Sequence, residues 1–393
     1  MNHTETPTPP QPAPYKAFRR MVARSPHEQH RVASTLELLF DLVFVVAIAF
    51  AGAQLHHALS ANHAAHGVLS FGLVFFAIWW AWMGFTWFAS AFDTDDVPYR
   101  MAVWVQMAGA LVIAAGVVPA FDKGNFTTVT LGYMLMRLAS VAQWLRASVQ
   151  SPEHRQTCRR YALGIGLVQL GWLANLATPP SWALPVFGLL VVCELAVPVW
   201  SERAGTTPWH PHHIAERYGL MTIIVLGESV LAVATGVQSA TAQGVWGWDL
   251  LALSVGALLV VYCLWWIYFE DSVGQRLHEL STAYLWGYGH YVLFAAAAAT
   301  GAGLAVQVDL LKGQAELSAM AGALALAVPV VIYVLAVWFL QKCNAPHQVG
   351  GRWLLPVAAL LMMVTPWLPV NTALAIGLLL VGTLAVAMSL RQP

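Results

Sequence analysis

Two carboxylates lie close together at the start of the first long apolar segment, STLELLFDLVFVVAIAF. Glu37 and Asp41 are four residues apart, which places both side chains on one face of a helix, about 6 Å apart along its axis. An alternative for Glu37 is a capping box with Ser34, where the helix dipole also favours a carboxylate. Asp41 lies one turn deeper, beyond the reach of a cap, and therefore indicates a site or a buried ion pair.

A second group of charges lies in the segment HPHHIAERYGLMTIIVLGES. Glu228 follows Arg217 by eleven residues, about 16 Å along a helix axis and about 20° around it, so both side chains share one stripe. Glu216 and Arg217 lie near a membrane interface, where snorkelling is the alternative to a functional role. Gly219 and Gly227 would let a neighbouring helix approach. Glu228 cannot snorkel easily, and among the acids it is the first candidate for a functional carboxylate.

Three further polar residues lie within apolar segments. A charge in the hydrocarbon region costs at least about 2.5 to 3.5 kcal/mol, so each one needs a partner. Arg137 is predicted near the centre of the bilayer, with Glu228 or Asp41 as its partner; a purely structural ion pair is the alternative. His290 is either a core histidine with satisfied hydrogen bonds or part of a pathway. Glu194 is a secondary candidate with no decided role.

The depths of these residues predict a polar cavity that opens to the cytoplasm and is closed toward the outside. Arg137 and Glu228 lie nearer the centre of the bilayer. The remaining candidates are predicted in the cytoplasmic half: Glu37, Asp41, Glu194, Glu216, Arg217 and His290.

Motifs for metal, nucleotide or hydrolytic chemistry are missing from the sequence. The histidine runs have no HExxH or carboxylate spacing, and there is no GxSxG, P-loop or strand-preceded GxGxxG. The cysteines are isolated from one another: Cys158, Cys193, Cys263 and Cys343. We therefore predict no metal and no cofactor.

The aromatic runs FFAIWWAWMGFTWFASAF and YCLWWIYF indicate core packing and an interfacial belt, with a cavity for an apolar or cationic ligand as the alternative.

The composition decides the class of protein that holds these residues. Of 393 residues, 59% are hydrophobic and 10% are charged, against about 45 to 50% apolar and about 25% charged in soluble domains. Lys plus Arg and Asp plus Glu are equal at 19 each, so there is no basic surface for nucleic acid. A soluble enzyme and a nucleic-acid-binding protein are excluded.

The apolar runs predict an all-α integral membrane protein, a polytopic bundle of about twelve transmembrane helices. Ten or eleven spans are the alternative, because Pro366 and Pro369 separate the last two runs. Residues 1–33 are predicted to be a disordered cytoplasmic tail with no cleaved signal peptide. A first six-helix half over 34–200, a connector over 201–211 and a second half over 212–393 would follow. The predicted spans start near Leu36, Gly67, Met101, Phe126, Tyr161, Trp182, His212, Gly247, Ala283, Leu317, Trp353 and Thr372.

Basic residues set the orientation, because positively charged loops resist translocation. With the amino terminus inside, the outer loops hold only Lys123 and Lys312, and Arg137 and Arg217 fall within spans. The other fifteen lie in cytoplasmic segments: Lys16, Arg19, Arg20, Arg24, Arg31, Arg100, Arg146, Arg155, Arg159, Arg160, Arg203, Arg276, Lys342, Arg352 and Arg391. We predict a bacterial inner-membrane protein with a cytoplasmic amino terminus.

A weak internal repeat at an offset of about 178 residues accompanies the two proposed halves. Leu36-Glu37 recurs as Ala215-Glu216, and an aromatic run that closes on Asp93 recurs as one that closes on Glu270. Six spans per unit would give both halves the same orientation, as in many transporters. The alternative is that any two Trp-rich membrane helices look alike.

Three segments of the chain resemble the bacterial low temperature requirement protein A family. STLELLFDLVFVVAIAF is similar to that family's opening acidic-aromatic helix, HHIAERYGLMTIIVLGES to its His-x-x-Glu-Arg helix ending in Leu-Gly-Glu, and AYLWGYGHY to a further segment. The likeness covers nearly the whole chain after about residue 30. It implies an integral membrane protein named for a growth phenotype in the cold, and it implies no biochemical activity.

The leading functional hypothesis is a secondary transporter, with proton coupling as one form. Glu228, or the Glu37 and Asp41 pair, would exchange a proton while Arg137 and Arg217 hold the counter-charge. Its partners would be the bilayer, protons and an unidentified small solute or ion. The alternatives are a non-transporting stress or membrane-organisation protein with structural ion pairs, and a membrane-embedded enzyme with carboxylates and His290 as acid and base.

Overall fold

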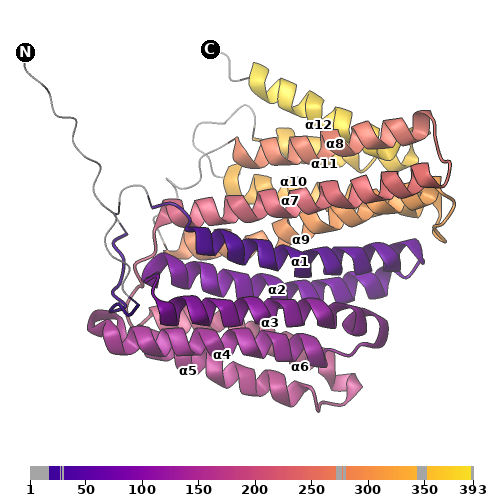
Figure 1. The fold of residues 1–393 in the computed structure, drawn as a ribbon. Coiled ribbons are helices and arrows are strands. Elements are labelled where there is room, and N and C mark those ends of the chain that lie inside the picture. Colours follow the sequence, from indigo (N-terminus) through magenta and orange to yellow (C-terminus); the bar gives the residue numbers. More distant parts are fainter. Residues whose placement is uncertain are drawn as a thin grey trace, which may run out of the picture.

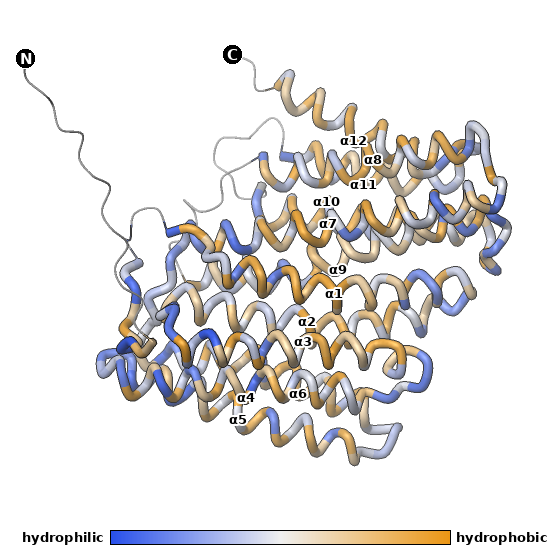
Figure 2. Tube along the Cα trace, viewed as in Figure 1, coloured by the Kyte–Doolittle hydropathy of each residue, from blue (hydrophilic) through white to orange (hydrophobic). Residues whose placement is uncertain are grey.

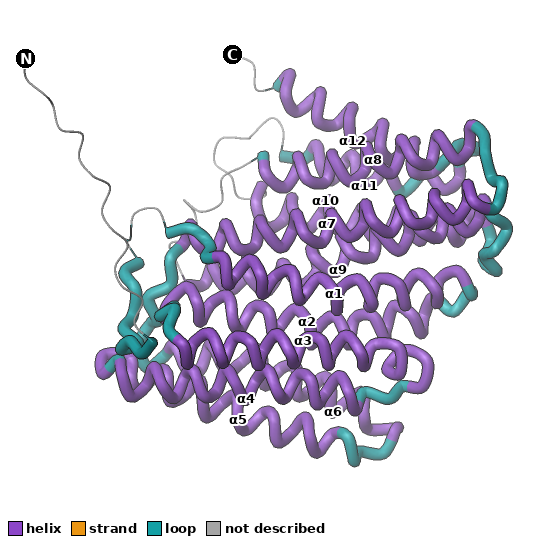
Figure 3. The backbone as a smooth tube through the Cα atoms, in the orientation of Figure 1, coloured by secondary structure: helices purple, strands orange, loops and turns teal. Residues whose placement is uncertain are grey.

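The computed structural model describes residues 17–26, 28, 31–270, 277, 280–342 and 352–390, and over these residues the fold is all helical (Figures 1 and 3). The predicted starts differ from the observed helix starts by at most six residues, at the fifth helix. The helices are α1 (Thr35–Ser60), α2 (Ala64–Phe92), α3 (Val97–Lys123), α4 (Thr127–Gln150), α5 (Arg155–Asn175), α6 (Pro180–Glu202), α7 (Pro211–Ala242), α8 (Trp248–Phe269), α9 (Leu280–Leu311), α10 (Ala319–Val337), α11 (Leu354–Met362) and α12 (Thr372–Ser389).

Nine of the described helices are long and apolar enough to cross a membrane: α1, α2, α3, α6, α7, α8, α9, α10 and α12. The helices α4 and α5 have the necessary length but carry more polar residues, and they pack beside α3 and α6 in the same bundle (Figure 1). With nine residues, α11 is about 14 Å long, which is too short to cross a hydrocarbon core of about 30 Å. The chain is a polytopic helical membrane protein.

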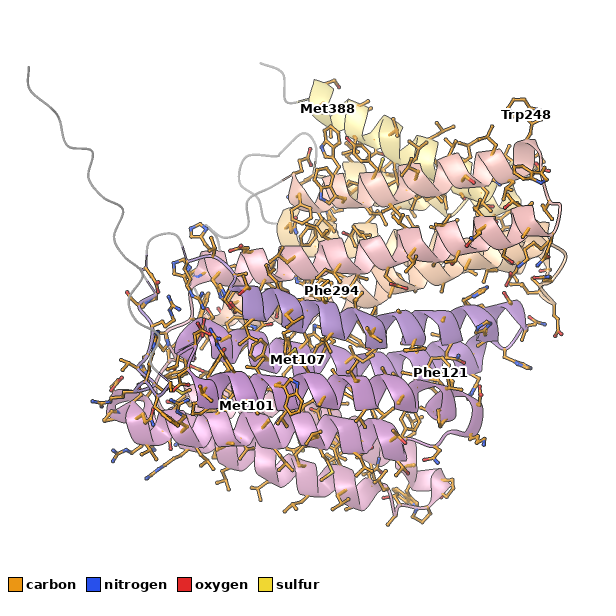
Figure 4. All side chains as sticks on the ribbon, viewed as in Figure 1. Met101, Met107, Phe121, Trp248, Phe294 and Met388 are labelled. Atoms are coloured by element: carbon orange, nitrogen blue, oxygen red, sulfur yellow. The ribbon has the colours of Figure 1, made fainter. Side chains whose placement is uncertain are left out.

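Consecutive helices run in alternating directions, so the connections gather at the two ends of the bundle (Figure 3). We call the end that holds the start of α1 and the α2–α3, α4–α5 and α6–α7 connections the terminal face, and the other end the opposite face. Hydrophilic residues gather at these two ends (Figure 2). Trp246 and Trp248 at the opposite face are 76% and 84% exposed, and Figure 4 shows Trp248 at that end. These two tryptophans fit an interfacial belt.

The order of helix packing in the first six helices recurs in the last six. In the first set, α1 packs on α2 and α3, α2 on α3 and α4, α3 on α4, α4 on α5, and α5 on α6. The same seven pairs occur among α7–α12 in the same order, and in this set α12 also packs on α8 and α10. Contacts between the sets run mainly through α1 and α2, which lie against α7 and α9.

The centre of the bundle is aromatic and holds α2 against α7 and α9. The Trp82 ring lies 5.0 Å from Tyr218 and 5.7 Å from Phe294, and the Trp79 ring lies 5.3 Å from Tyr291. Figure 4 places Phe294 inside the bundle. Tilted and edge-to-face pairs of this kind stabilise a packed interior. The run of aromatic residues in α2 is therefore mainly core.

The amino-terminal segment packs on the terminal face. Residues 1–16 lie outside the described residues, but the Met21 side chain is fully buried and the Arg24 amide donates a hydrogen bond to the Ala91 carbonyl at 2.9 Å. The Met21 amide also donates to the Gln150 side chain at 2.7 Å. The prediction of a disordered segment up to residue 33 is wrong for residues 17–26, because the ends of α2 and α4 offer them polar partners.

Candidate functional site

One buried ion pair joins the two sets of helices. In the second turn of α1, one Asp41 carboxylate oxygen accepts hydrogen bonds from Arg217 at 2.6 Å and from the Trp82 indole at 2.8 Å. Asp41 and Arg217 are both 0% exposed. The charges neutralise one another in a place that water does not reach, so removing either one would leave the other unpaired.

A second pair lies one turn closer to the terminal face. The His213 ring nitrogen Nε2 lies 3.0 Å from a Glu37 oxygen, and Arg217 lies 3.9 Å from the same oxygen. Glu37 also completes a capping box, since its other oxygen accepts from the Ser34 amide at 2.7 Å while the Ser34 hydroxyl accepts from the Glu37 amide. The capping box that the sequence offers for Glu37 is therefore present, together with the contact to His213.

The two pairs join residues at the same positions, counted from the starts of α1 and α7. Glu37 and His213 are the third residues of their helices, and Asp41 and Arg217 are the seventh. Both pairs are therefore separated by 176 residues in the sequence. This spacing was the signal that could have identified His213, which we did not predict as a site residue.

More charges surround these pairs at the terminal face, outside the spans. The Asp93 carboxylate, just after α2, lies 3.6 Å from Arg31 and 3.7 Å from Arg24. Burial raises the pKa of Asp93 to about 6; the nearby Glu37 carboxylate acts in the same direction, and the two arginines oppose it. Asp93 therefore changes its charge at a mildly acidic pH.

A separate buried carboxylate, Glu194 of α6, is the most densely hydrogen-bonded acid in the described chain. It is 0% exposed. Its five donors come from α2, α4 and α5 and include one cation: Trp80 at 2.9 Å, Tyr133 at 2.6 Å, Arg137 at 2.9 Å, Gln169 at 3.0 Å and Trp172 at 3.2 Å. We call Glu194 with these five residues the Glu194 cluster.

Arg137 pairs with Glu194, so the prediction that its partner is Glu228 or Asp41 is wrong. The reason is the packing order: α4, α5 and α6 are neighbours, while Asp41 is already neutralised by Arg217 and Glu228 lies on α7. Gly84 makes room for the guanidinium, because a Cβ there would lie 2.7 Å from an Arg137 nitrogen. Glu194, the secondary candidate in the sequence, is the partner.

Cavities lie on both sides of the Glu194 cluster. One of about 410 Å³ is lined by the Glu194 donors Tyr133 and Trp172 and reaches the opposite face at Asn125 and Thr178. Another of about 50 Å³ is lined by Trp80 and Arg137 and extends toward the terminal face at Thr207 and Trp209. The cluster thus separates two cavities along the direction in which the helices run.

These two cavities differ from the cavity that the sequence predicts. We expected a cavity that opens at the face with the amino terminus, whereas the cavity of about 410 Å³ reaches the opposite face and the one of about 50 Å³ extends toward the terminal face. We expected Glu37 and Asp41 to line a cavity, but their carboxylates contact His213 and Arg217 of α7, and all four side chains are buried.

His290, Glu216 and Glu228 belong neither to the Glu194 cluster nor to the pairs of Asp41 and Glu37. His290 is a buried core histidine whose Nδ1 lies 2.7 Å from the Trp286 carbonyl and whose Nε2 lies 3.0 Å from the Tyr268 hydroxyl. Glu216 is half-buried and accepts a hydrogen bond from the Ala33 amide at 3.3 Å. Glu228 is half-buried in the wall of another cavity, between α1, α7 and α9.

The chemistry available at these sites is charge pairing and proton exchange. Within the described ranges, no group of three or more His, Cys, Asp or Glu side chains could hold a metal ion.

The sequence does not predict the Glu194 cluster as a unit, because its members come from four helices and show no local spacing. Its polar members Gln169 and Tyr133, each within an apolar run, were the available signal.

Comparisons with known proteins agree with the helical architecture. The model of the bacterial low temperature requirement A protein (LtrA) family matches residues 32–389. The chain is 28% identical over 275 residues to the uncharacterized protein RA0937 of Rhizobium meliloti (strain 1021), an alignment that covers 66% of this chain and 65% of that protein. No solved structure matches the chain. Because the family match spans nearly the whole length, the chain belongs to the bacterial low temperature requirement A family.

Proposed function

We propose that this protein is a secondary transporter whose pathway runs between α2, α4, α5 and α6. The observation that carries this proposal is the buried Arg137–Glu194 ion pair, which lies between a cavity of about 410 Å³ on one side and a cavity of about 50 Å³ on the other. Intramembrane charges that face a cavity commonly mark substrate or ion pathways. The structure would then be a state open to the opposite face and closed to the terminal face.

In this proposal Glu194 exchanges a proton and Arg137 supplies the counter-charge. A proton on Glu194 would remove the negative charge that holds Arg137. The guanidinium, which lines the smaller cavity, would then bind an anionic group of a solute that enters through the larger one. Loss of the proton would restore the pair and release the anion. The solute class that fits this exchange is a small organic or inorganic anion.

We also propose that the two sets of six helices are two similar halves related along the membrane normal. The recurrence of seven helix pairs supports this, as do the Glu37–His213 and Asp41–Arg217 contacts, which join residues at the same positions of α1 and α7. Halves of this kind rock against each other in many transporters. The Asp41–Arg217 and Glu37–His213 pairs would then hold the halves in register.

The test is proton flux in proteoliposomes under an imposed pH gradient, read with a trapped pH-sensitive dye and repeated with a panel of small anions, cations and neutral solutes. Wild type should dissipate the gradient faster with at least one anion than without it. Glu194→Gln should abolish this difference. The exposed Glu316 of the α9–α10 connection provides the matched control, and Glu316→Gln should behave as wild type.

Tyr133→Phe keeps the experiment decisive if Glu194→Gln does not fold. It removes one donor from Glu194, leaves the Arg137 pair in place, and should shift the pH dependence of flux without abolishing it. If wild-type liposomes match empty ones with every solute, the transport proposal fails.

A second candidate is a non-transporting membrane protein in which the ion pairs only hold helices together. The saturation of Glu194 by five donors favours it, because so many hydrogen bonds resist the separation that a transport cycle needs. In that case Glu194→Gln lowers stability, and no solute changes the proton flux of wild type.

A further inference from the structure

A cavity of about 750 Å³ lies between α1, α7 and α9, apart from the Glu194 cluster. Small residues leave this space unfilled, among them Gly52 and Ala53 of α1 and Gly301, Ala302 and Ala305 of α9. Its volume falls in the range of about 300 to 1,000 Å³ that is usual for small-molecule sites. The wall is mostly apolar and includes few charged groups.

Glu228 carries the unbalanced charge of this cavity. Two other charged residues line it toward the opposite face, but Asp309 is paired, with His56 at 2.6 Å and Lys312 at 3.3 Å. Among the residues that the structure describes, no hydrogen bond or ion pair reaches the Glu228 carboxylate. Asp41 and Glu194, by contrast, each have an arginine partner.

The cavity opens on the outer surface of the bundle. Val46, Phe50 and Leu231 all line it and are 37%, 45% and 55% exposed. These residues belong to the apolar parts of α1 and α7, so in a bilayer the opening meets lipid. A ligand that dissolves in the membrane can therefore reach Glu228 without crossing a loop.

We propose that this cavity binds a lipophilic organic cation, with the positive charge against the Glu228 carboxylate and the apolar body between α1 and α9. A lone carboxylate in an apolar wall favours a cation, because each charge would otherwise lie in hydrocarbon without a partner. A neutral lipid chain would gain no binding free energy from the Glu228 carboxylate, and the carboxylate would repel an anionic lipid. The site shares no residue with the proposed transport pathway and stands without it.

Equilibrium binding of radiolabelled tetraphenylphosphonium to the full chain in phosphatidylcholine nanodiscs tests the proposal. This probe keeps its charge at every pH, and empty nanodiscs correct for its partition into lipid. Wild type should bind it saturably. Glu228→Gln keeps the side-chain shape and should weaken binding about tenfold or more, as expected for a lost charge-assisted contact. Glu316→Gln is the carboxylate control and should leave binding unchanged.

A second pair of variants tests the cavity by its shape. Ala232 lines the cavity, whereas the exposed Ala234 of the same helix does not. Ala232→Phe should fill the space and abolish binding with Glu228 intact, and Ala234→Phe should not. Three outcomes overturn the proposal: wild type retains no more probe than empty nanodiscs, Glu228→Gln binds as wild type does, or Ala232→Phe leaves binding unchanged. The first of these would mean that lipid fills the cavity.

Discussion

The Arg137–Glu194 and Asp41–Arg217 ion pairs differ in how many other groups support the carboxylate. Glu194 accepts hydrogen bonds from four side chains besides Arg137, whereas Asp41 accepts one, from Trp82, besides Arg217. An ion pair with few additional donors depends more on its partner. Asp41 and Arg217 should therefore be the more strongly coupled pair in unfolding measurements.

Breaking the Asp41–Arg217 pair should destabilise the protein by about 3 to 5 kcal/mol, because one charge stays buried without compensation. Asp41→Asn retains an acceptor for the Trp82 indole, so its effect isolates the loss of charge. The double variant Asp41→Asn with Arg217→Gln should be less destabilised than the sum of the single variants. Unfolding in detergent measures all three against wild type, and additive effects would contradict the coupling.

Asp93 should make stability depend on pH, and in the direction opposite to that of an acid whose pKa is lowered in the folded protein. Its folded pKa of about 6 lies above the ordinary value of 3.8, so the folded protein binds more protons than the unfolded chain between these values. The Asp93 contribution to stability is then greatest at low pH and falls as pH rises from about 4 to about 6. Asp93→Asn should remove this fall from a series of unfolding temperatures. An unchanged slope in the variant would show that Asp93 does not titrate there.

The sequence identified the individual charges better than their partners. Asp41, Arg217 and Arg137 were found because a charge inside an apolar run is visible in one dimension. The pairing of Arg137 with Glu194 was not, since it depends on α4 and α6 lying on either side of α5. A one-dimensional pattern gives the depth of a charge in the bilayer but does not show which helix faces it.

At the scale of elements, caps and close contacts between helices decide where each helix begins and which helices touch. Ser34, Asp96, Ser318 and Asn371 each cap a helix start with a side-chain oxygen. Such residues are visible in the sequence, and they help explain why the predicted starts lie within six residues of the observed ones. The contacts are less visible: Gly227, which we expected to admit a neighbouring helix, has open space around it.

Gly132 in α4 should be intolerant of any side chain. A Cβ there would lie 2.6 Å from the Ile113 amide nitrogen and 2.7 Å from the Gly109 carbonyl oxygen, and neither backbone group of α3 can move alone. Gly132→Ala should therefore destabilise the protein by at least about 1 to 3 kcal/mol through overpacking. Gly166 in α5 has nothing within 4 Å of a Cβ, and Gly166→Ala should stabilise by about 0.5 to 1 kcal/mol. The two unfolding temperatures should lie on opposite sides of the wild-type value; if they do not, α3 and α4 are not in close contact.

At the scale of the whole molecule, the helices alternate in direction, so successive connections, with their basic residues, lie at alternate faces of the bundle. Lys123 ends α3 at the opposite face and Lys312 follows α9 there, while Arg203 follows α6 at the terminal face. The segments to which the sequence analysis assigns most of the Lys and Arg residues are those that form the terminal face. Since positively charged loops resist translocation, we expect the terminal face to lie in the cytoplasm.

Labelling of single cysteines measures this orientation directly. In a background with the four native cysteines replaced by alanine, Lys123→Cys and Arg203→Cys introduce thiols at exposed positions of the opposite and terminal faces. A membrane-impermeant maleimide applied to right-side-out spheroplasts should label the Lys123→Cys protein at once and the Arg203→Cys protein only after lysis. The reverse pattern would place the cavity of about 410 Å³ at the cytoplasmic side. Protons that enter from outside would then approach Glu194 from the terminal face, where the structure is closed. The pH gradient imposed in the transport experiment would therefore have to be inverted.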